Sequence, residues 1–229
     1  MRSSDMKRRI RHHIDNLGHE DERVARRSEQ YLVDCYGAEA IHELIEACED
    51  PNPNVRHRAV WVIGHTRDPA AYDSIMRLTR DADFNVMADA ILGLGRLGDI
   101  RAMPWLIDCI SGKDIDIPMA CWYACHAIKL MGAPAIDYLV PLLYDADDDT
   151  IGRAVLLLGD IEHESVIRHL FDRLKCANAP LRVEILGSLS VSRYSRVIEI
   201  IDLYLDNEDE HVRECARASH DIFLEAHPA

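Results

Sequence analysis

The closest approach to a thiol and imidazole ligand cluster in the sequence is Cys121, Cys125 and His126. The two cysteines are four residues apart, so in a helix they would lie one turn apart on the same face. Thiolate and imidazole are ligands that Zn²⁺ prefers, but a structural site needs four of them, and no second pair with matching spacing is present. We therefore interpret these thiols as small core residues and expect no metal.

A second candidate is the acidic run Asp145, Asp147, Asp148 and Asp149, whose carboxylates could bind a hard cation. The run lacks the spacing and the central glycine of an EF-hand loop. A solvated acidic edge is the simpler interpretation. The sequence also shows no glycine-rich phosphate loop, no Gly-x-Ser-x-Gly elbow and no pair of catalytic carboxylates at a meaningful spacing. These patterns predict neither a metal centre nor a catalytic site, and no cofactor.

The charge of the chain limits its partners. Its 229 residues carry 40 acidic against 26 basic side chains, a net charge of −14. A field of this sign repels a nucleic-acid duplex and an anionic membrane, so we expect neither as a partner. The basic run from Lys7 to His13 is too short to reverse this balance, and Asp15 and Glu20 to Glu22 follow it closely.

Cysteine usage and hydropathy predict a soluble cytoplasmic protein. The seven cysteines are odd in number, scattered, and mostly embedded in apolar helical pattern, which is typical of reduced core thiols rather than of a secreted disulfide framework. No apolar run is long enough to span a membrane, and no signal-peptide stretch follows the basic start.

The elements that must position any site are visible as a repeat. Val55 to Asp68 (VRHRAVWVIGHTRD) recurs 31 residues later as Val86 to Asp99 (VMADAILGLGRLGD). A small or apolar residue in the middle of each first helix marks the register at Ser28, Ala59, Ala90, Ala124, Ala154, Ile185 and Ala216. Each unit consists of a first helix rich in Ala, Val, Leu and Ile, a break at Gly-Asp or Asp-Pro, and a second helix with an apolar pair.

One such unit cannot bury its apolar face, so neighbouring units must stack. The sequence predicts an all-α fold of about seven helical hairpins in a single domain, 1–229. The predicted boundaries are a capping helix at 1–17 and repeats near 18–50, 51–81, 82–114, 115–147, 148–178, 179–209 and 210–229.

The Val-Arg…Ala…Leu-Gly…Gly-Asp pattern resembles the HEAT repeat, in particular the short form named after phycobilisome lyases. The resemblance covers nearly the whole chain and implies a right-handed α-solenoid whose second helices line its concave face. Proteins of this group include protein-binding scaffolds, bilin lyase subunits and phycobilisome-degradation proteins. The resemblance therefore implies a non-enzymatic scaffold for a partner protein or, alternatively, a bilin lyase-like or linear-tetrapyrrole-binding protein.

On that architecture, equivalent positions of the second helices form rows. One row places Trp105, Tyr138 and His169 side by side, and its charged surroundings are Glu43, Arg77, Asp108 and Asp172. An aromatic ridge flanked by charges is typical of a binding hot spot, here for a partner with a basic surface. The alternative is that these rings pack between repeats. In a bilin-handling protein the same three residues would be the walls and the proton donor of the groove.

A second candidate surface lies on the first helices, where the aromatic residues are Trp61, Trp122, Tyr123 and His126. If these positions face outward, they form an interface with a partner or with a second copy of the chain, as in a homodimer. The alternative is thicker packing between repeats.

Two HEAT-like enzyme classes fit poorly. Deoxyhypusine hydroxylases hold a di-iron centre on His-Glu pairs placed after the Val-Arg of several repeats. The corresponding pairs here are His57-Arg58, Ala88-Asp89 and Glu214-Cys215. HEAT-like DNA glycosylases need a basic concave face, whereas the second helices of this chain carry mainly acidic residues.

Overall fold

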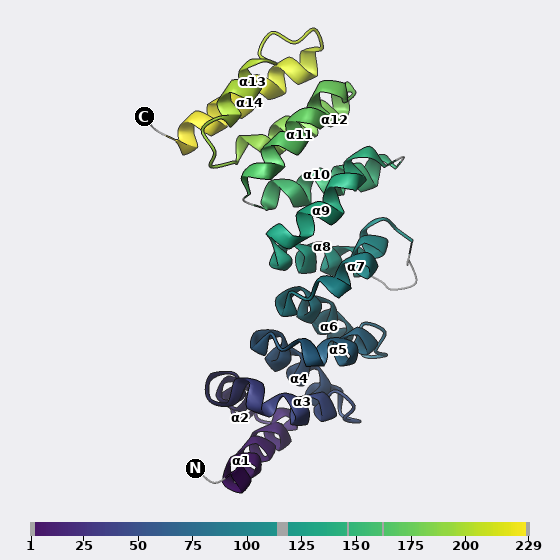
Figure 1. Cartoon of the computed structure of the whole chain (residues 1–229), viewed down its shortest axis with the longest axis vertical. Helices are drawn as coiled ribbons and strands as arrows, with labels where there is room; N and C mark the ends of the chain where they lie inside the picture. The colour runs from purple at the N-terminus through teal and green to yellow at the C-terminus, as the bar shows by residue number, and fades with distance from the viewer. Residues whose placement is uncertain (1–2, 114–118, 146, 162, 228–229) are drawn as a thin grey trace. The chain divides into compact units, whose positions relative to one another are not determined.

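The computed structural model describes residues 3–113, 119–145, 147–161 and 163–227, and none of these residues lies in a strand. The all-α fold class is confirmed: paired helices follow one another along the chain (Figure 1). Contacts divide the chain into two compact units, Met1–Met131 and Gly132–Ala229. The division falls inside the predicted fourth repeat, between its two helices. The two units are described separately below.

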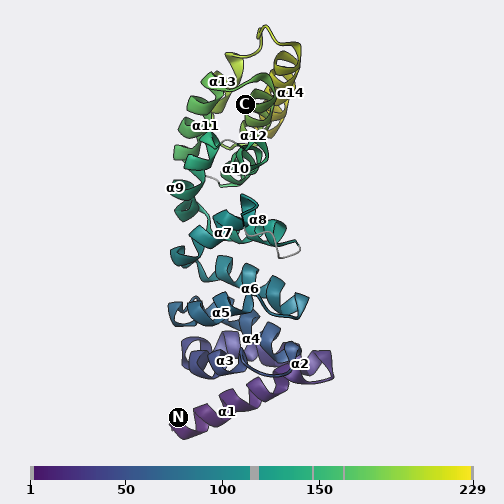
Figure 2. The same cartoon turned by 90° about the vertical axis from the view of Figure 1, so that its right-hand side faces the viewer.

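The first unit contains the helices α1 (Ser3–Asp15), α2 (Glu22–Tyr31), α3 (Ile41–Ala47), α4 (Pro53–Thr66), α5 (Tyr72–Leu78), α6 (Phe84–Leu97), α7 (Met103–Ile110) and α8 (Ala120–Met131). A π-helical turn, Leu32–Tyr36, continues α2. The first helices α4, α6 and α8 pack against one another in sequence, and α5 and α7 are the second helices (Figure 2). The core of the unit is the layer between these two rows of helices.

The second unit contains α9 (Ile136–Leu139), α10 (Asp148–Asp160), α11 (Glu164–Cys176), α12 (Ala179–Ser190), α13 (Val197–Asp202) and α14 (Glu210–Ala226). Its first helices α10, α12 and α14 pack in the same serial manner. After one turn, α9 continues as a 3-10 helix, Val140–Tyr144. Pro141 explains this change, because it has no N–H to donate to the carbonyl one α-helical turn earlier.

Asp and Asn residues of the links fix where the helices begin. A side-chain oxygen accepts a backbone N–H of the first turn at Asp21, Asn52, Asp83, Asp147, Asn178 and Asp209. Asp68 and Asp99 act in the same way before the second helices α5 and α7. The acidic links of the repeat are therefore N-caps, which satisfy donors that have no partner inside the helix.

The arginine of the Val-Arg motif joins two successive links. Arg56 donates from Nε and Nη2 to the two carboxylate oxygens of Asp81, each at 2.8 Å, and from Nη1 to the carbonyl of Asp50 at 2.8 Å. Burial acts to raise the pKa of Asp81, but the hydrogen bonds from Arg56 and from the Asp83 N–H outweigh it and hold this pKa below its usual value. The pair therefore locks α4 to the link that precedes α6.

Gly95 allows the closest approach of two helices in the first unit. A Cβ atom at this position would lie 2.4 Å from the carbonyl oxygen of Ala127 on α8. Backbone cannot move aside as the end of a flexible side chain can, so any other residue would push α6 away from α8. Gly187 on α12 is different, because a Cβ there would meet no atom within 4 Å.

Within the described residues, no single helix is long and apolar enough to cross a membrane. Among these residues, one pair of neighbouring segments, Ala120–Met131 and Ala133–Tyr144, is long and apolar enough for a membrane span when the two are counted together, but the pair is broken by a bend.

We expect Gly95→Ala to lower the free energy of unfolding by more than about 2 kcal/mol, because it separates α6 from α8. Gly187→Ala is the matched control and should raise stability by roughly 0.5–1 kcal/mol, since alanine is the better helix former. Urea denaturation followed by circular dichroism measures both changes. Equal effects of the two substitutions would refute the close approach.

We expect Arg56→Gln to lower stability at neutral pH by roughly 1–2 kcal/mol, because it leaves the nearly buried Asp81 carboxylate without its cation. Because the pKa of Asp81 is lowered in the folded state, its ionised carboxylate stabilises the fold at pH values above the unfolded-state pKa of about 4. This stabilisation is lost as the pH falls through the folded-state pKa. Wild type and variant should therefore converge in acid. Arg8→Gln, which removes a cation from an exposed pair with Asp5, should change stability by less than about 0.5 kcal/mol. A constant difference across the pH range would contradict the assignment.

Candidate functional site

Four aromatic rings from α6 and α8 form a connected group, named here the aromatic cluster: Phe84, Trp122, Tyr123 and His126. The ring centroids are 6.0 Å apart for Phe84 and Tyr123, 4.8 Å for Tyr123 and Trp122, and 4.1 Å for Trp122 and His126. Trp122 meets Tyr123 edge to face, an arrangement that aromatic pairs prefer. Each ring thus holds its neighbour in place.

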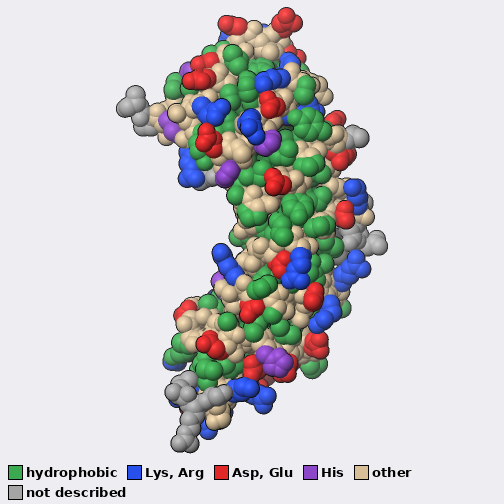
Figure 3. All heavy atoms as spheres, viewed as in Figure 1, with side chains coloured by type: hydrophobic (Ala, Val, Ile, Leu, Met, Phe, Trp, Pro, Cys, Tyr) green, Lys and Arg blue, Asp and Glu red, His purple; other side chains and the backbone are tan. Residues whose placement is uncertain are grey.

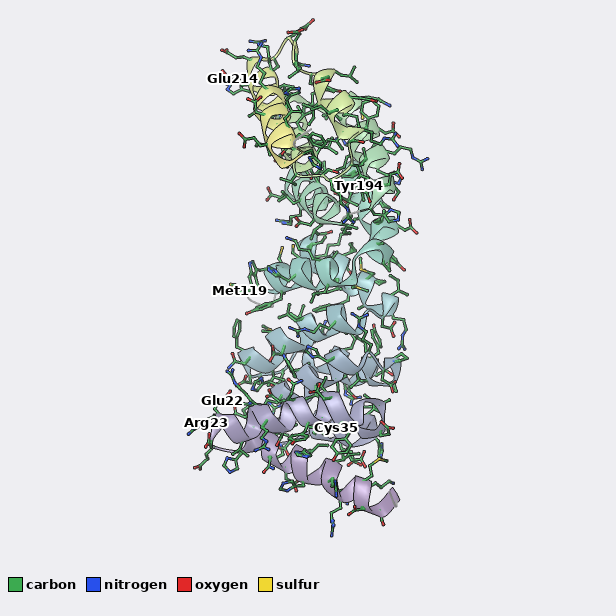
Figure 4. All side chains as sticks on the ribbon, turned by 90° about the vertical axis from the view of Figure 1, so that its left-hand side faces the viewer. Glu22, Arg23, Cys35, Met119, Tyr194 and Glu214 are labelled. Carbon is green, nitrogen blue, oxygen red and sulfur yellow. The ribbon has the colours of Figure 1, made fainter. Side chains whose placement is uncertain are left out.

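The aromatic cluster is substantially exposed. Phe84 is 48% exposed and Trp122 is 50% exposed, while Tyr123 and His126 are half-buried. Met119, just before α8, is 55% exposed and lies at the edge of the first unit at which the first helices begin (Figure 4). A contiguous apolar surface of this kind on a charged chain is typical of an interaction site. Phe84 and Met119 were not among the predicted site residues. Phe84 is aromatic but does not share a repeat position with the other rings, and Met119 is not aromatic.

The histidines of this surface are oriented by the tryptophans. His126 Nδ1 lies 3.0 Å from the carbonyl oxygen of Trp122, and His65 Nδ1 lies 2.7 Å from that of Trp61. In the second pair the ring centroids are 4.0 Å apart. Because a carbonyl oxygen only accepts, Nδ1 carries a proton in both pairs. The Trp-x-x-x-His spacing in the sequence is the signal that could have found His65.

Trp61 is half-buried beside a polar hollow of about 400 Å³ on the same unit. The hollow is lined by carboxylates that already have partners. The buried Arg58 binds Glu22 and Glu29, and His57 Nδ1 lies 2.9 Å from Asp89 Oδ2. This part of the surface is therefore a set of ion pairs between neighbouring first helices rather than an open acid–base site.

The predicted second-helix residues of the first unit differ in exposure. Glu43 on α3 is buried and Trp105 on α7 is half-buried, whereas Arg77 on α5 and Asp108 on α7 are exposed. The Nε1 atom of Trp105 is buried and has no hydrogen-bond partner among the described residues. In this unit, the residue just before the apolar pair of each second helix thus packs against the neighbouring helices. The residues three positions later are the exposed ones.

The second unit holds the remaining predicted residues. Tyr138 on α9 is 37% exposed and His169 on α11 is half-buried. Asp172 is exposed and lies 2.8 Å from Lys175, whose hydrogen bond lowers the pKa of this carboxyl. Because Trp105 belongs to the first unit, the common row of Trp105, Tyr138 and His169 stays a prediction.

Charges of both signs surround these surfaces. Lys and Arg side chains are interspersed with Asp and Glu side chains over the face shown in Figure 3. Among the residues that the structure describes, no three His, Cys, Asp or Glu side chains are placed to hold a metal ion.

The seven cysteines occupy three kinds of environment. Cys48 and Cys109 are buried, Cys35 and Cys176 are exposed, and the other three are half-buried: Cys121, Cys125 and Cys215. Burial raises the pKa of Cys48 to about 12. The interpretation of the cysteines as core residues is therefore wrong for Cys35 and Cys176, whose side chains are exposed. Both lie near the end of a helical segment.

We expect iodoacetamide at pH 8 to alkylate Cys35 and Cys176 readily and to leave Cys48 unmodified in the native protein. The thiolate is the reactive form, and Cys48 is both shielded and protonated at this pH. Peptide mass spectrometry after timed labelling measures each site, and labelling in denaturant is the control. Native Cys48 reacting as fast as Cys176 would contradict the burial.

Comparison with known proteins connects this geometry to a family. The family model described as HEAT repeats matches residues 41–120. The matched stretch runs from α3 to the start of α8, and the resemblance predicted from the sequence is confirmed.

A curated protein to which this chain is similar is described as "Uncharacterized phycocyanin operon protein Z" of Pseudanabaena tenuis (strain PCC 7409). It is 22% identical over 189 residues, which cover 79% of this chain and 93% of the relative. The chain is therefore related to a phycocyanin operon protein.

Three solved structures are similar to the chain over most of its length. The complex of CpcE and CpcF of phycocyanin lyase from Nostoc sp. PCC7120 is 19% identical, with 93% of each chain covered and a TM-score of 0.47. Human deoxyhypusine hydroxylase in complex with glycerol is 18% identical, with 97% and 98% covered and a TM-score of 0.45. The archaeal HEAT-like repeats protein from Thermococcus onnurineus NA1 is 13% identical, with 94% and 97% covered and a TM-score of 0.49.

Proposed function

We propose that this chain is a non-enzymatic HEAT-repeat scaffold that binds a partner protein through the aromatic cluster on α6 and α8. The observation that carries the proposal is the unbroken series of ring contacts from Phe84 through Tyr123 and Trp122 to His126. Tryptophan and tyrosine dominate binding hot spots, and rings that are already fixed lose little conformational freedom when a partner docks.

The partner is a folded protein whose apolar patch is edged by basic residues. The net charge of −14 attracts such a protein at long range. Asp89 and Glu22 on the neighbouring first helices are already paired with His57 and Arg58, so the attraction to a basic partner comes from the overall charge of the chain. The apolar rings supply the affinity and the charges set the orientation.

Exposed second-helix residues of each unit remain further candidate docking positions in this proposal. In the first unit Arg77 and Asp108 are exposed, whereas Glu43 is buried and contributes to packing. In the second unit Asp172 is exposed and Tyr138 is more than a third exposed.

A second candidate function is supported by the phycocyanin operon relative. It is the handling of a linear tetrapyrrole, for which Tyr138 and His169 of the second unit are the candidate wall and proton donor. A saturable shift of the visible absorption band on mixing with biliverdin, abolished by Tyr138→Phe with His169→Gln, would favour this function over the scaffold.

The scaffold function is tested by removing one ring of the aromatic cluster. A partner captured by the wild-type chain from its source cell is identified, produced and titrated by calorimetry. We expect Trp122→Ala to weaken its binding by about thirtyfold, the effect of losing a hot-spot side chain worth roughly 2 kcal/mol. Circular dichroism checks that the half-exposed substitution leaves the fold intact.

Two variants serve as controls. Leu156→Ala removes a side chain that is 62% exposed on α10 and should leave the affinity within about twofold. Tyr138→Ala combined with His169→Ala tests the second-helix rows. If Trp122→Ala binds as tightly as the wild type, the aromatic cluster is not the site. If Trp122→Ala abolishes self-association of the chain and leaves partner binding unchanged, the aromatic cluster binds a second copy of this chain.

A further inference from the structure

An elongated hollow of about 800 Å³ lies along α2 in the first unit, between that helix and α1. Arg23 and Cys35 both line it and lie at opposite ends of the helical segment that begins with α2 (Figure 4). They are twelve positions apart, which corresponds to about 18 Å of helix. The hollow lies in the amino-terminal helices, outside the aromatic cluster and the second-helix rows.

The lining of the hollow is cationic in an otherwise acidic chain. Arginine and histidine side chains from both helices line it: Arg9, His12, His13, Arg23 and Arg27. No carboxylate is among the lining residues. The basic run of the sequence, too short by itself to reverse the net charge, is joined here by two arginines of α2. Folding thus makes a local positive site that the linear sequence does not show.

Arg27 is the most available of these cations. Arg9 and Arg23 have Asp5 at 3.7 Å and Asp21 at 3.5 Å at the rim of the hollow. Within the described part of the chain no carboxylate lies within the ion-pair distance of 4.0 Å from Arg27. Its guanidinium lies 5.6 Å from the centroid of the Tyr31 ring. An anion that enters the hollow therefore meets a cation that no carboxylate neutralises.

Aromatic rings form the second part of the lining. The His13 ring stacks on Tyr31 with a centroid separation of 5.0 Å and an interplanar angle of 16°, and Tyr36 lies 5.9 Å from His13. Burial, and then the charges of His12 and Arg27, lower the pKa of His13, so its ring is neutral at pH 7. The neutral ring and the tyrosines offer flat surfaces on which a planar ligand can stack.

We propose that this hollow binds a small, planar aromatic anion, with Arg27 as the main cation and Tyr31 as the stacking surface. The ligand class combines a conjugated ring system with a carboxylate, sulfonate or phosphate group. The ring fits the stacked rings of the lining, and the anionic group offsets a cluster of cations that would otherwise repel one another.

The test uses the thiol of Cys35, which is exposed and lines the hollow. Anilinonaphthalene sulfonate, an aromatic anion with a planar naphthalene ring system, is added to the full-length protein, and the rate of Cys35 alkylation by uncharged iodoacetamide is followed by mass spectrometry. Cys176, in the second unit, is the internal reference. We expect saturable protection of Cys35 and none of Cys176. Phenylnaphthylamine, which has the same rings without the sulfonate, should protect only at about tenfold higher concentration.

The matched variants are Arg27→Gln and Arg26→Gln. Both remove one charge from neighbouring exposed positions of α2, but Arg26 binds Glu22 and does not line the hollow. We expect Arg27→Gln to raise the half-protecting concentration of the sulfonate about tenfold and Arg26→Gln to change it less than twofold. Tyr31→Leu should weaken protection by both probes. Equal shifts for the two arginine variants, or no protection in the wild type, would overturn the proposal.

Discussion

The burial of each first helix against the first helices on either side is the constraint on which the rest of this structure depends. A single hairpin of this chain has an apolar face too large to leave in water and too small to fold alone. The side chains at the register positions Ala59, Ala90 and Ala124 are fully buried, which lets α4, α6 and α8 approach closely. Gly95 marks the limit of that approach, because at this point backbone of α6 meets backbone of α8.

Polar interactions then determine the register in which the helices stack. The Asx caps set the first residue of α2, α4, α6, α10, α12 and α14, and a helix that begins at a fixed residue presents a fixed face to its neighbour. Arg56 adds a direct connection between two links by binding Asp81 and a carbonyl of the preceding link. These contacts are weak individually when compared with the apolar core, but they decide which side chains face outward.

The surfaces that result are different in kind. The aromatic cluster is apolar and lies on neighbouring first helices, where side chains from consecutive repeats come into contact. The hollow between α1 and α2 is cationic and aromatic, and it is lined by side chains of both helices. A repeat protein can thus carry a surface for a protein and a separate site for a small molecule, since each depends on different members of the stack.

The sequence by itself determined the fold class and the repeat. Periodic apolar residues, the Asp and Asn of the links and the Gly-Asp breaks are local signals, and the structure places helix starts at these residues because capping and helix packing act over a few positions. The Trp-x-x-x-His pairing was also present in the sequence, since residues four apart meet on any helix.

Tertiary structure alone decided which of these residues are exposed and which of them meet. The sequence predicts a surface charge at Glu43, but this side chain is buried. It predicts a core thiol at Cys35, but this side chain is exposed. Phe84 joins Tyr123 across 39 positions of sequence, and Arg9 shares a hollow with Arg27, because the angle and separation of packed helices bring them together. Those quantities depend on every side chain in the helix interface at once, so no local pattern encodes them.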